Sequence, residues 1–178
     1  EAWVGIAHAA VSLPAATVTF TSTDDGQTGD FSQYMDLVVV MYARSDRAGT
    51  WTSSYVHVNN MTSSGDYAGQ DLHGDGSTVT ASVASTSKGG IWYLPNAGAT
   101  ANVFGCCVYQ FHDINSGKYK SFSTLAASEG GTENLVRMVA STAKTQAPIT
   151  EIDLVTGNGN YIAGSTFSLF GILPRMVA

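Results

Sequence analysis

Charged side chains are scarce in this chain. Only 12% of its 178 residues are Asp, Glu, Lys or Arg, about half of the roughly 25% that soluble domains carry. The 14 acidic residues outnumber the 8 basic ones, so the formal net charge is −6. Binding to duplex nucleic acid needs clustered Lys and Arg that displace counterions. The composition therefore predicts no nucleic-acid partner.

Long apolar runs and a disulfide framework are also missing. No run of residues is long and apolar enough for a transmembrane helix, so we expect no membrane partner. The only cysteines are the neighbours Cys106 and Cys107, which on a strand would point to opposite faces and be poorly placed to pair. Free thiols of this kind are typical of a protein assembled in a reducing compartment, such as the cytoplasm of a cell.

The residues that are abundant favour β-structure. Ser, Thr and Gly occur 19 times each, whereas Lys, Arg and Glu occur 4 times each. Long helices need the residues of the second group, and turn-rich strand proteins use those of the first. With 44% hydrophobic residues, a chain of this length can bury its own core as one domain.

Short apolar or alternating segments recur along the chain, separated by clusters rich in Gly, Asn, Asp and Ser. The segments predicted as strands are residues 16–20, 34–44, 55–59, 103–111, 118–125, 133–142, 149–155 and 166–172. Gly and Asn between them supply the positive-φ positions of tight turns. This spacing predicts an all-β fold, an antiparallel β-sandwich or jelly roll, built as a single domain with long loops.

The most apolar of these segments supply a candidate core. Its members are Val38, Val40, Val108, Phe111, Leu154, Phe167 and Leu169. The sandwich domain is expected to span residues 14–178. The Ala-rich residues 1–13 before it are either an arm that docks on a neighbouring chain or the first edge strand.

Two regions are candidate interfaces with other chains. One is the N-terminal segment, and the other is residues 69–100, which are expected to be long loops with one or two short strands. The interface candidates are Trp3, Val4, Ile6, Trp92, Tyr93 and Leu94. Aromatic residues are enriched at interface hot spots, although Trp92 could equally plug the end of the sandwich or stack on a sugar.

No pattern for catalysis or metal binding stands out. The chain has no Gly-x-Ser-x-Gly elbow, no phosphate-binding Gly-Lys loop and no Cys-x-x-Cys spacing. Residues 71–76 loosely match the start of a calcium loop, but Ser82 stands where the bidentate Glu belongs. Neither His57 nor the pair at 112–113 has a nucleophile marked beside it. We predict no enzyme, no cofactor and no metal.

Six short motifs follow one another between about Asp36 and Ile172. They are Ala-Arg-Ser-Asp-Arg (43–47), Val-His-Val-Asn (56–59), a leucine before Gly-Asp-Gly-Ser (72–77), Asn-Ser-Gly-Lys-Tyr-Lys-Ser-Phe (115–122), Ala-Pro-Ile-Thr-Glu-Ile-Asp-Leu (147–154) and Ser-Thr-Phe-Ser-Leu-Phe-Gly-Ile (165–172). In this order they resemble a family of small virion proteins and appendage domains of tailed bacteriophages, common in cyanophages. The last motif is similar to that family's usual ending.

The resemblance implies a β-sandwich or jelly roll with a structural role and no catalytic residues. The leading expectation is a capsid decoration, or cement, protein that clamps neighbouring major capsid subunits on the outer head surface, as a homotrimer with contacts in residues 69–100. The alternative is a tail-fibre or appendage domain that recognises host surface glycans. The loop at 92–95, the cysteine pair and the acidic stretch at 22–30 depart from the family pattern, so head and tail both stay open.

Overall fold

The computed structural model describes residues 3–130 and 134–174, which form strands and one short 3-10 helix, η1 (Phe31–Gln33). The strands are β1 (Trp3–Ala10), β2 (Thr17–Thr21), β3 (Asp36–Ala43), β4 (Trp51–Val58), β5 (Tyr67–Gly74), β6 (Val79–Val83), β7 (Gly89–Pro95), β8 (Gly105–Phe111), β9 (Lys120–Glu129), β10 (Asn134–Ala143), β11 (Glu151–Thr156) and β12 (Thr166–Ile172). The predicted all-β class is confirmed.

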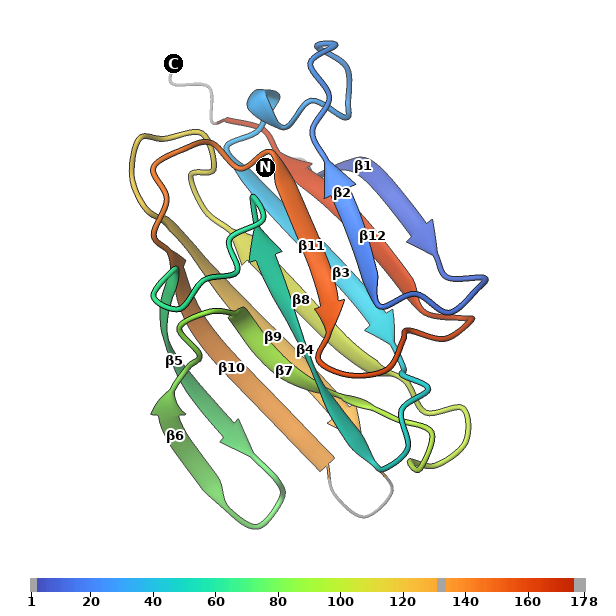
Figure 1. The fold of residues 1–178 in the computed structure, drawn as a ribbon. Coiled ribbons are helices and arrows are strands. Elements are labelled where there is room, and N and C mark those ends of the chain that lie inside the picture. The colour runs from blue at the N-terminus through green and yellow to red at the C-terminus, as the bar shows by residue number, and fades with distance from the viewer. Residues whose placement is uncertain (1–2, 131–133, 175–178) are drawn as a thin grey trace.

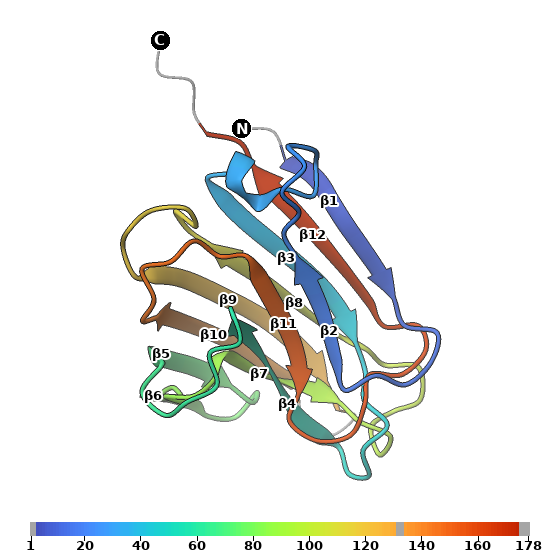
Figure 2. The same cartoon turned by 45° about the horizontal axis from the view of Figure 1, so that its top comes forward.

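The strands build two antiparallel sheets that lie face to face (Figures 1 and 2). The larger sheet has the order β1-β12-β3-β8-β9-β10-β5-β6, and the smaller has the order β2-β11-β4-β7. Apolar side chains from the two facing surfaces interdigitate in one core. The predicted β-sandwich in a single domain is therefore also confirmed.

Eight of the strands are wound as a jelly roll. The first pairs with the last, β1 with β12, and the order continues inward with β2 and β11, β3 and β8, and β4 and β7. Successive pairs alternate between the larger and the smaller sheet. This nesting of hairpin-like pairs is the double Greek key of jelly rolls.

Two inserted hairpins extend the larger sheet beyond the jelly roll. Strands β5 and β6 come between β4 and β7 in the chain, and β9 and β10 come between β8 and β11. In space the four lie side by side next to β8, in the order β9-β10-β5-β6. We refer to these four strands as the wing. Figure 1 shows β6 at its free edge, beyond the reach of the smaller sheet.

Five of the seven candidate core residues are buried. They are Val38, Phe111, Leu154, Phe167 and Leu169. The prediction is wrong for Val40 and Val108, which are 36% and 37% exposed. These two are cross-strand partners on the outer face of the larger sheet. Strand β3 is apolar on both faces, so its sequence does not show which alternate residues point to the core.

The N-terminal segment lies in the chain's own sandwich. Residues 3–10 form β1, which pairs with β12 at one edge of the larger sheet. The ring of Trp3 lies 5.6 Å from that of Phe170, while Val4 and Ile6 pack against the core. Of the two alternatives for this segment, the structure has the first edge strand.

Residues 69–100 are more regular than expected. They include most of β5 and all of β6 and β7. Small and polar residues make up most of β5 and β6, so their alternation carries little hydrophobic signal. The long loops predicted here are therefore replaced by the outer half of the wing and an edge strand of the smaller sheet.

Candidate interaction surface

The residues that loosely match a calcium loop already have protein partners. Asp71 is buried and forms an ion pair with Arg137. Asp75 accepts hydrogen bonds from the backbone N–H groups of Ser77 and Thr78, at 2.9 and 2.7 Å. Within residues 3–130 and 134–174, no group of three or more His, Cys, Asp and Glu side chains is placed to hold a metal ion. Both carboxylates therefore stabilise the wing.

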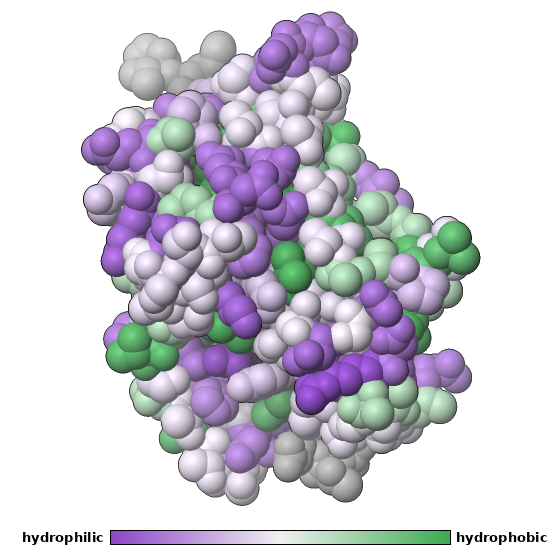
Figure 3. Space-filling view, viewed as in Figure 1, coloured by the Kyte–Doolittle hydropathy of each residue, from purple (hydrophilic) through white to green (hydrophobic). Residues whose placement is uncertain are grey.

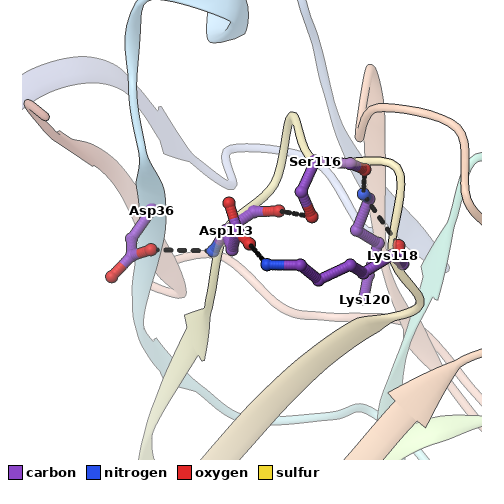
Figure 4. Close-up of polar contacts among 5 residues, drawn as sticks. All are labelled: Asp36, Asp113, Ser116, Lys118 and Lys120. Atoms are coloured by element: carbon purple, nitrogen blue, oxygen red, sulfur yellow. Dashed lines mark hydrogen bonds and ion pairs between the residues drawn. The ribbon is translucent and has the colours of Figure 1, made fainter.

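The His112–Asp113 pair lies at the start of the turn between β8 and β9. Figure 4 shows Asp113 with its polar neighbours. Asp113 adopts a left-handed φ of 51°, and its N–H donates to the Asp36 carboxylate at 2.8 Å. Its own carboxylate lies 3.1 Å from the Lys118 ammonium. This hydrogen bond is the main cause that holds the pKa of Asp113 below its usual value. The Asp113 carboxylate thus closes the turn instead of orienting a catalytic histidine.

The aromatic candidates in β7 point to both sides of the strand. Trp92 and Leu94 are fully buried in the core, which corrects their assignment to an interface. Only Tyr93 between them is partly exposed, because successive residues of a strand point to opposite faces. The guanidinium of Arg137 lies over its ring, 4.7 Å from the ring centre.

A charged cluster is buried between β7 and the wing. Arg137 of β10 pairs with Asp71 of β5, and each is less than one-tenth exposed. His73 Nδ1 and the hydroxyl of Ser82 also contact the Asp71 carboxylate, both at 3.0 Å. Burial raises the pKa of Asp71, but these hydrogen bonds and the Arg137 charge outweigh it and hold the pKa below its usual value. The cluster joins three strands of the wing.

The outer face of the larger sheet carries a continuous row of apolar side chains. In antiparallel sheets, directly paired residues lie on the same face. Successive cross-strand partners from β3 to β6 form a row of Val40, Val108, Leu125, Met138, Leu72 and Ala81. We refer to them as the apolar row. All six side chains are exposed, and those of Leu125 and Met138 are 55% exposed.

The rest of this outer face carries few charged side chains. Further large apolar residues beside the row are Tyr42, Val79, Val83 and Val136. Along the outward positions of β3, β8 and the described wing strands, the only acidic or basic residues are Asp36 and Glu129, both at strand ends. A contiguous exposed apolar surface of this extent is typical of a protein–protein contact site.

The outer face is hollowed over the wing. Small side chains such as those of Ser123 and Ala140 lie beside Leu72 and Met138, leaving an open groove of about 370 Å³. A second groove of about 710 Å³ shares Ser123 and Ala140 and extends toward Lys144. A partner that covers this face would therefore meet a concave surface.

The opposite side of the molecule has a different character. Figure 3 looks onto the smaller sheet and shows hydrophilic residues in broad patches, with hydrophobic ones scattered between them. There Asp153 accepts a hydrogen bond from the Thr19 hydroxyl at 2.6 Å, and burial is the main cause that lowers the pKa of its cross-strand partner His57. The apolar character is therefore specific to the outer face of the larger sheet.

Sequence reasoning overlooked the apolar row, although a signal for it was present. Strands β3 and β8 are apolar on both faces, a pattern suited to burial on two sides. In the sandwich, the smaller sheet covers only the inner face of the larger sheet. The second apolar face of these strands is therefore left exposed in the single chain, with Val40 and Val108 on it.

None of the protein families, curated proteins or solved structures compared with this chain matches it. The described part of the chain also has no helix whose length and hydropathy would suit a membrane span. The surface of the protein itself is therefore the basis from which its function is inferred.

Proposed function

We propose that this protein is a structural component of a tailed-bacteriophage virion, a capsid decoration or cement protein on the outer surface of the head. It contacts neighbouring major capsid subunits through the outer face of the larger sheet. The observation that carries this proposal is the apolar row, which lies on a broad face with few charged side chains. The jelly-roll winding and the resemblance of the six sequence motifs to those of phage virion proteins support it further.

The dimensions of the outer face suit a stable contact. The larger sheet has eight strands, which lie about 4.8 Å apart. With about seven residues per strand and a rise of about 3.3 Å per residue, its outer face has an area of roughly 900 Å². A standard interface buries about 800 Å² on each partner. The net charge of −6 disfavours nonspecific binding to nucleic acid.

The tail-fibre alternative depended on loop aromatics that could stack on glycans. Trp92 is fully buried in β7, and one face of the Tyr93 ring is covered by Arg137. Within this pair, only the partly exposed Tyr93 is left as a candidate for stacking on a sugar. Glycan recognition therefore stays a prediction with weaker support from β7.

The test is cosedimentation of the purified protein with empty heads of the phage whose genome encodes it. The variant is the double substitution Leu125→Glu/Met138→Lys, which places opposite charges on two cross-strand partners and leaves the net charge unchanged. Burying these charges in an interface costs several kcal/mol. We expect wild type to pellet with the heads and the variant to bind at least tenfold more weakly.

The matched control is Thr17→Glu/Thr21→Lys, which adds the same charges at exposed positions of β2 on the smaller sheet. It should bind heads as wild type does, and both variants should keep the far-ultraviolet circular dichroism of the wild type. Equal binding by all three proteins would exclude the outer face as the contact surface. Localisation at the tail in a cryo-EM map of the particle would contradict the decoration role itself.

A further inference from the structure

The free edge of the wing is unusually exposed. All five residues of β6 are exposed, and Val79 and Val83 are each 75% exposed. Strand β6 pairs with β5 on one side only and ends the larger sheet on the other. It is therefore open on both faces and along its edge.

Edge strands normally carry a feature that blocks pairing with another chain, such as a charge, a proline or a bulge. Strand β6 has none of these. Residues 76–87 contain no Asp, Glu, Lys, Arg or Pro, and the register between β5 and β6 is continuous. At the other edge of the same sheet, β1 has a register shift between Gly5 and Ala7. The β6 edge is thus open to a further strand.

The backbone geometry shows which groups face outward from this edge. The carbonyl of Thr78 and the N–H of Ala84 bond to the β5 side of the hairpin. In an antiparallel pair, main-chain groups alternate between the two sides of a strand. The N–H and C=O groups of Val79, Ala81 and Val83 therefore point away from β5.

The sequence of β6 is nearly symmetrical about its centre. It reads Val-Thr-Ala-Ser-Val, with Ala81 in the middle. If two copies run antiparallel about Ala81, Val79 meets Val83 of the second copy, and Thr80 meets Ser82 of the second copy. Each pair then joins side chains of matching size and polarity, which favours pairing between strands.

We propose that β6 is a homotypic contact site, at which two copies of this chain pair edge to edge about a two-fold axis through Ala81. Each outward residue then donates its N–H to, and accepts a hydrogen bond from, its partner on the other copy. The two larger sheets join into one continuous sheet, with both apolar rows on the same side. The pairing does not depend on the virion role.

The near-symmetry of β6 favours a second copy as the occupant, and the charge distribution permits it. Two chains of net charge −6 repel one another over most surfaces, and like charges across an interface are costly. The segment 76–87 is free of charge, so two copies approach there without that cost. A two-fold contact is also isologous, as in most soluble homo-oligomers.

The contact is expected to be weak in dilute solution. A five-residue strand is about 17 Å long, and pairing along it buries less than the roughly 1,200 Å² of standard interfaces. Sedimentation velocity up to about 1 mM protein, where a free energy of only about −4 kcal/mol populates a complex, should show a monomer–dimer equilibrium. A protein that stays monomeric at this concentration, or forms the homotrimer expected from the sequence, overturns the proposal.

The variant Ala81→Pro separates the effect on edge pairing from any effect on folding. Its missing N–H points away from β5, so the substitution removes no hydrogen bond within the chain, and proline is tolerated at such edge positions. We expect Ala81→Pro to abolish the dimer with little change in thermal stability. The control Ala81→Val, which suits a strand, should dimerise at least as well as wild type. Dimerisation of the proline variant would place the contact elsewhere.

Cysteine cross-linking tests the register. The background is Cys106→Ser, because Cys106 is an exposed free thiol whereas Cys107 is buried. On the two-fold axis, Ala81→Cys brings two Cα atoms to about 5.5 Å, within the range of a disulfide. The matched control Val79→Cys is about 13 Å from its own counterpart and should not cross-link. Equal cross-linking of both variants, or none with Ala81→Cys, contradicts this register.

Discussion

At the residue scale, the side chain of Arg137 holds the inner face of the wing together. It forms a buried ion pair with Asp71 and lies over the ring of Tyr93. An ion pair of this kind gives little net stability, since both charges were removed from water. Its residues are nevertheless sensitive, because the loss of one partner leaves the other charge buried and uncompensated.

We predict that Arg137→Met lowers the free energy of unfolding by about 3–5 kcal/mol, the usual cost of leaving a buried charge unpaired. The double variant Arg137→Met/Asp71→Leu should recover most of this loss, because neither charge is then present. Urea denaturation of the three proteins measures the effect. A double variant no more stable than the single one would show that Arg137 acts through packing alone.

Asp71 also makes the stability of the protein depend on acid pH. Its pKa in the folded chain lies below the ordinary 3.8, so the folded state favours the carboxylate more than the unfolded chain does. The resulting stability is fully present above the unfolded pKa and is lost as pH falls through the lower, folded pKa. Between pH 6 and pH 2.5, Asp71→Asn should lose less stability than wild type in urea titrations. Parallel pH profiles would contradict this assignment.

At the scale of single elements, β7 is an edge strand of the smaller sheet whose inward side chains lie in the core. Trp92 is its fully buried anchor, so truncation removes packing and leaves a cavity. We predict that Trp92→Ala lowers the free energy of unfolding by about 3–5 kcal/mol, whereas Tyr93→Ala costs less because Tyr93 is partly exposed. Thermal unfolding compares the two. An unchanged melting temperature for Trp92→Ala, with loss of assembly alone, would restore it as an interface residue.

Strand β1 has a comparable structural role at the edge of the larger sheet. It pairs with β12, and Val4 and Ile6 pack against the core. Deletion of residues 1–10 should therefore lower the melting temperature by several degrees, because it exposes the edge of β12 and removes apolar burial. The single substitution Trp3→Ala should lower the melting temperature less than the deletion does. A deletion variant that melts as wild type does but fails to bind heads would identify β1 as a docking arm.

At the scale of the whole molecule, the larger sheet has one face in the core and one outside it. The smaller sheet of the jelly roll covers the inner face of the larger sheet. The wing adds four strands to the larger sheet and so widens its outer face. The additional strands contribute Leu125, Met138 and Leu72 to the apolar row. The two insertions thus convert a sandwich into a platform with one broad apolar side.

This asymmetry predicts the behaviour of the free protein. Ammonium sulfate strengthens apolar association, so wild type should bind a phenyl column and elute only at low salt. Leu125→Glu/Met138→Lys should elute at higher salt, and Thr17→Glu/Thr21→Lys should elute with wild type. Identical elution of all three would mean that the apolar row does not dominate the surface.

The amino-acid sequence by itself determined the all-β class and the approximate position of most strands. These properties are local, because the alternation of apolar and polar residues and the spacing of turn residues depend only on residues close in the sequence. The prediction failed in strands where apolar and polar residues do not alternate clearly. Strand β3 is apolar at almost every position, so its pattern predicts Val40 in the core. Strand β6 is short and mixes Val with small polar residues, and it falls in the region where the sequence predicts long loops with one or two short strands.

Only the tertiary structure decided which strands are neighbours and which faces are covered. The pairing of Asp71 with Arg137 joins positions 66 residues apart, and the apolar row collects one residue from each of six strands. Of the six interface candidates, Trp92 and Leu94 lie in the core, because the larger sheet covers the face of β7 on which they lie. Hydrophobicity shows that a side chain needs a partner, but long-range strand order decides whether the chain itself supplies one.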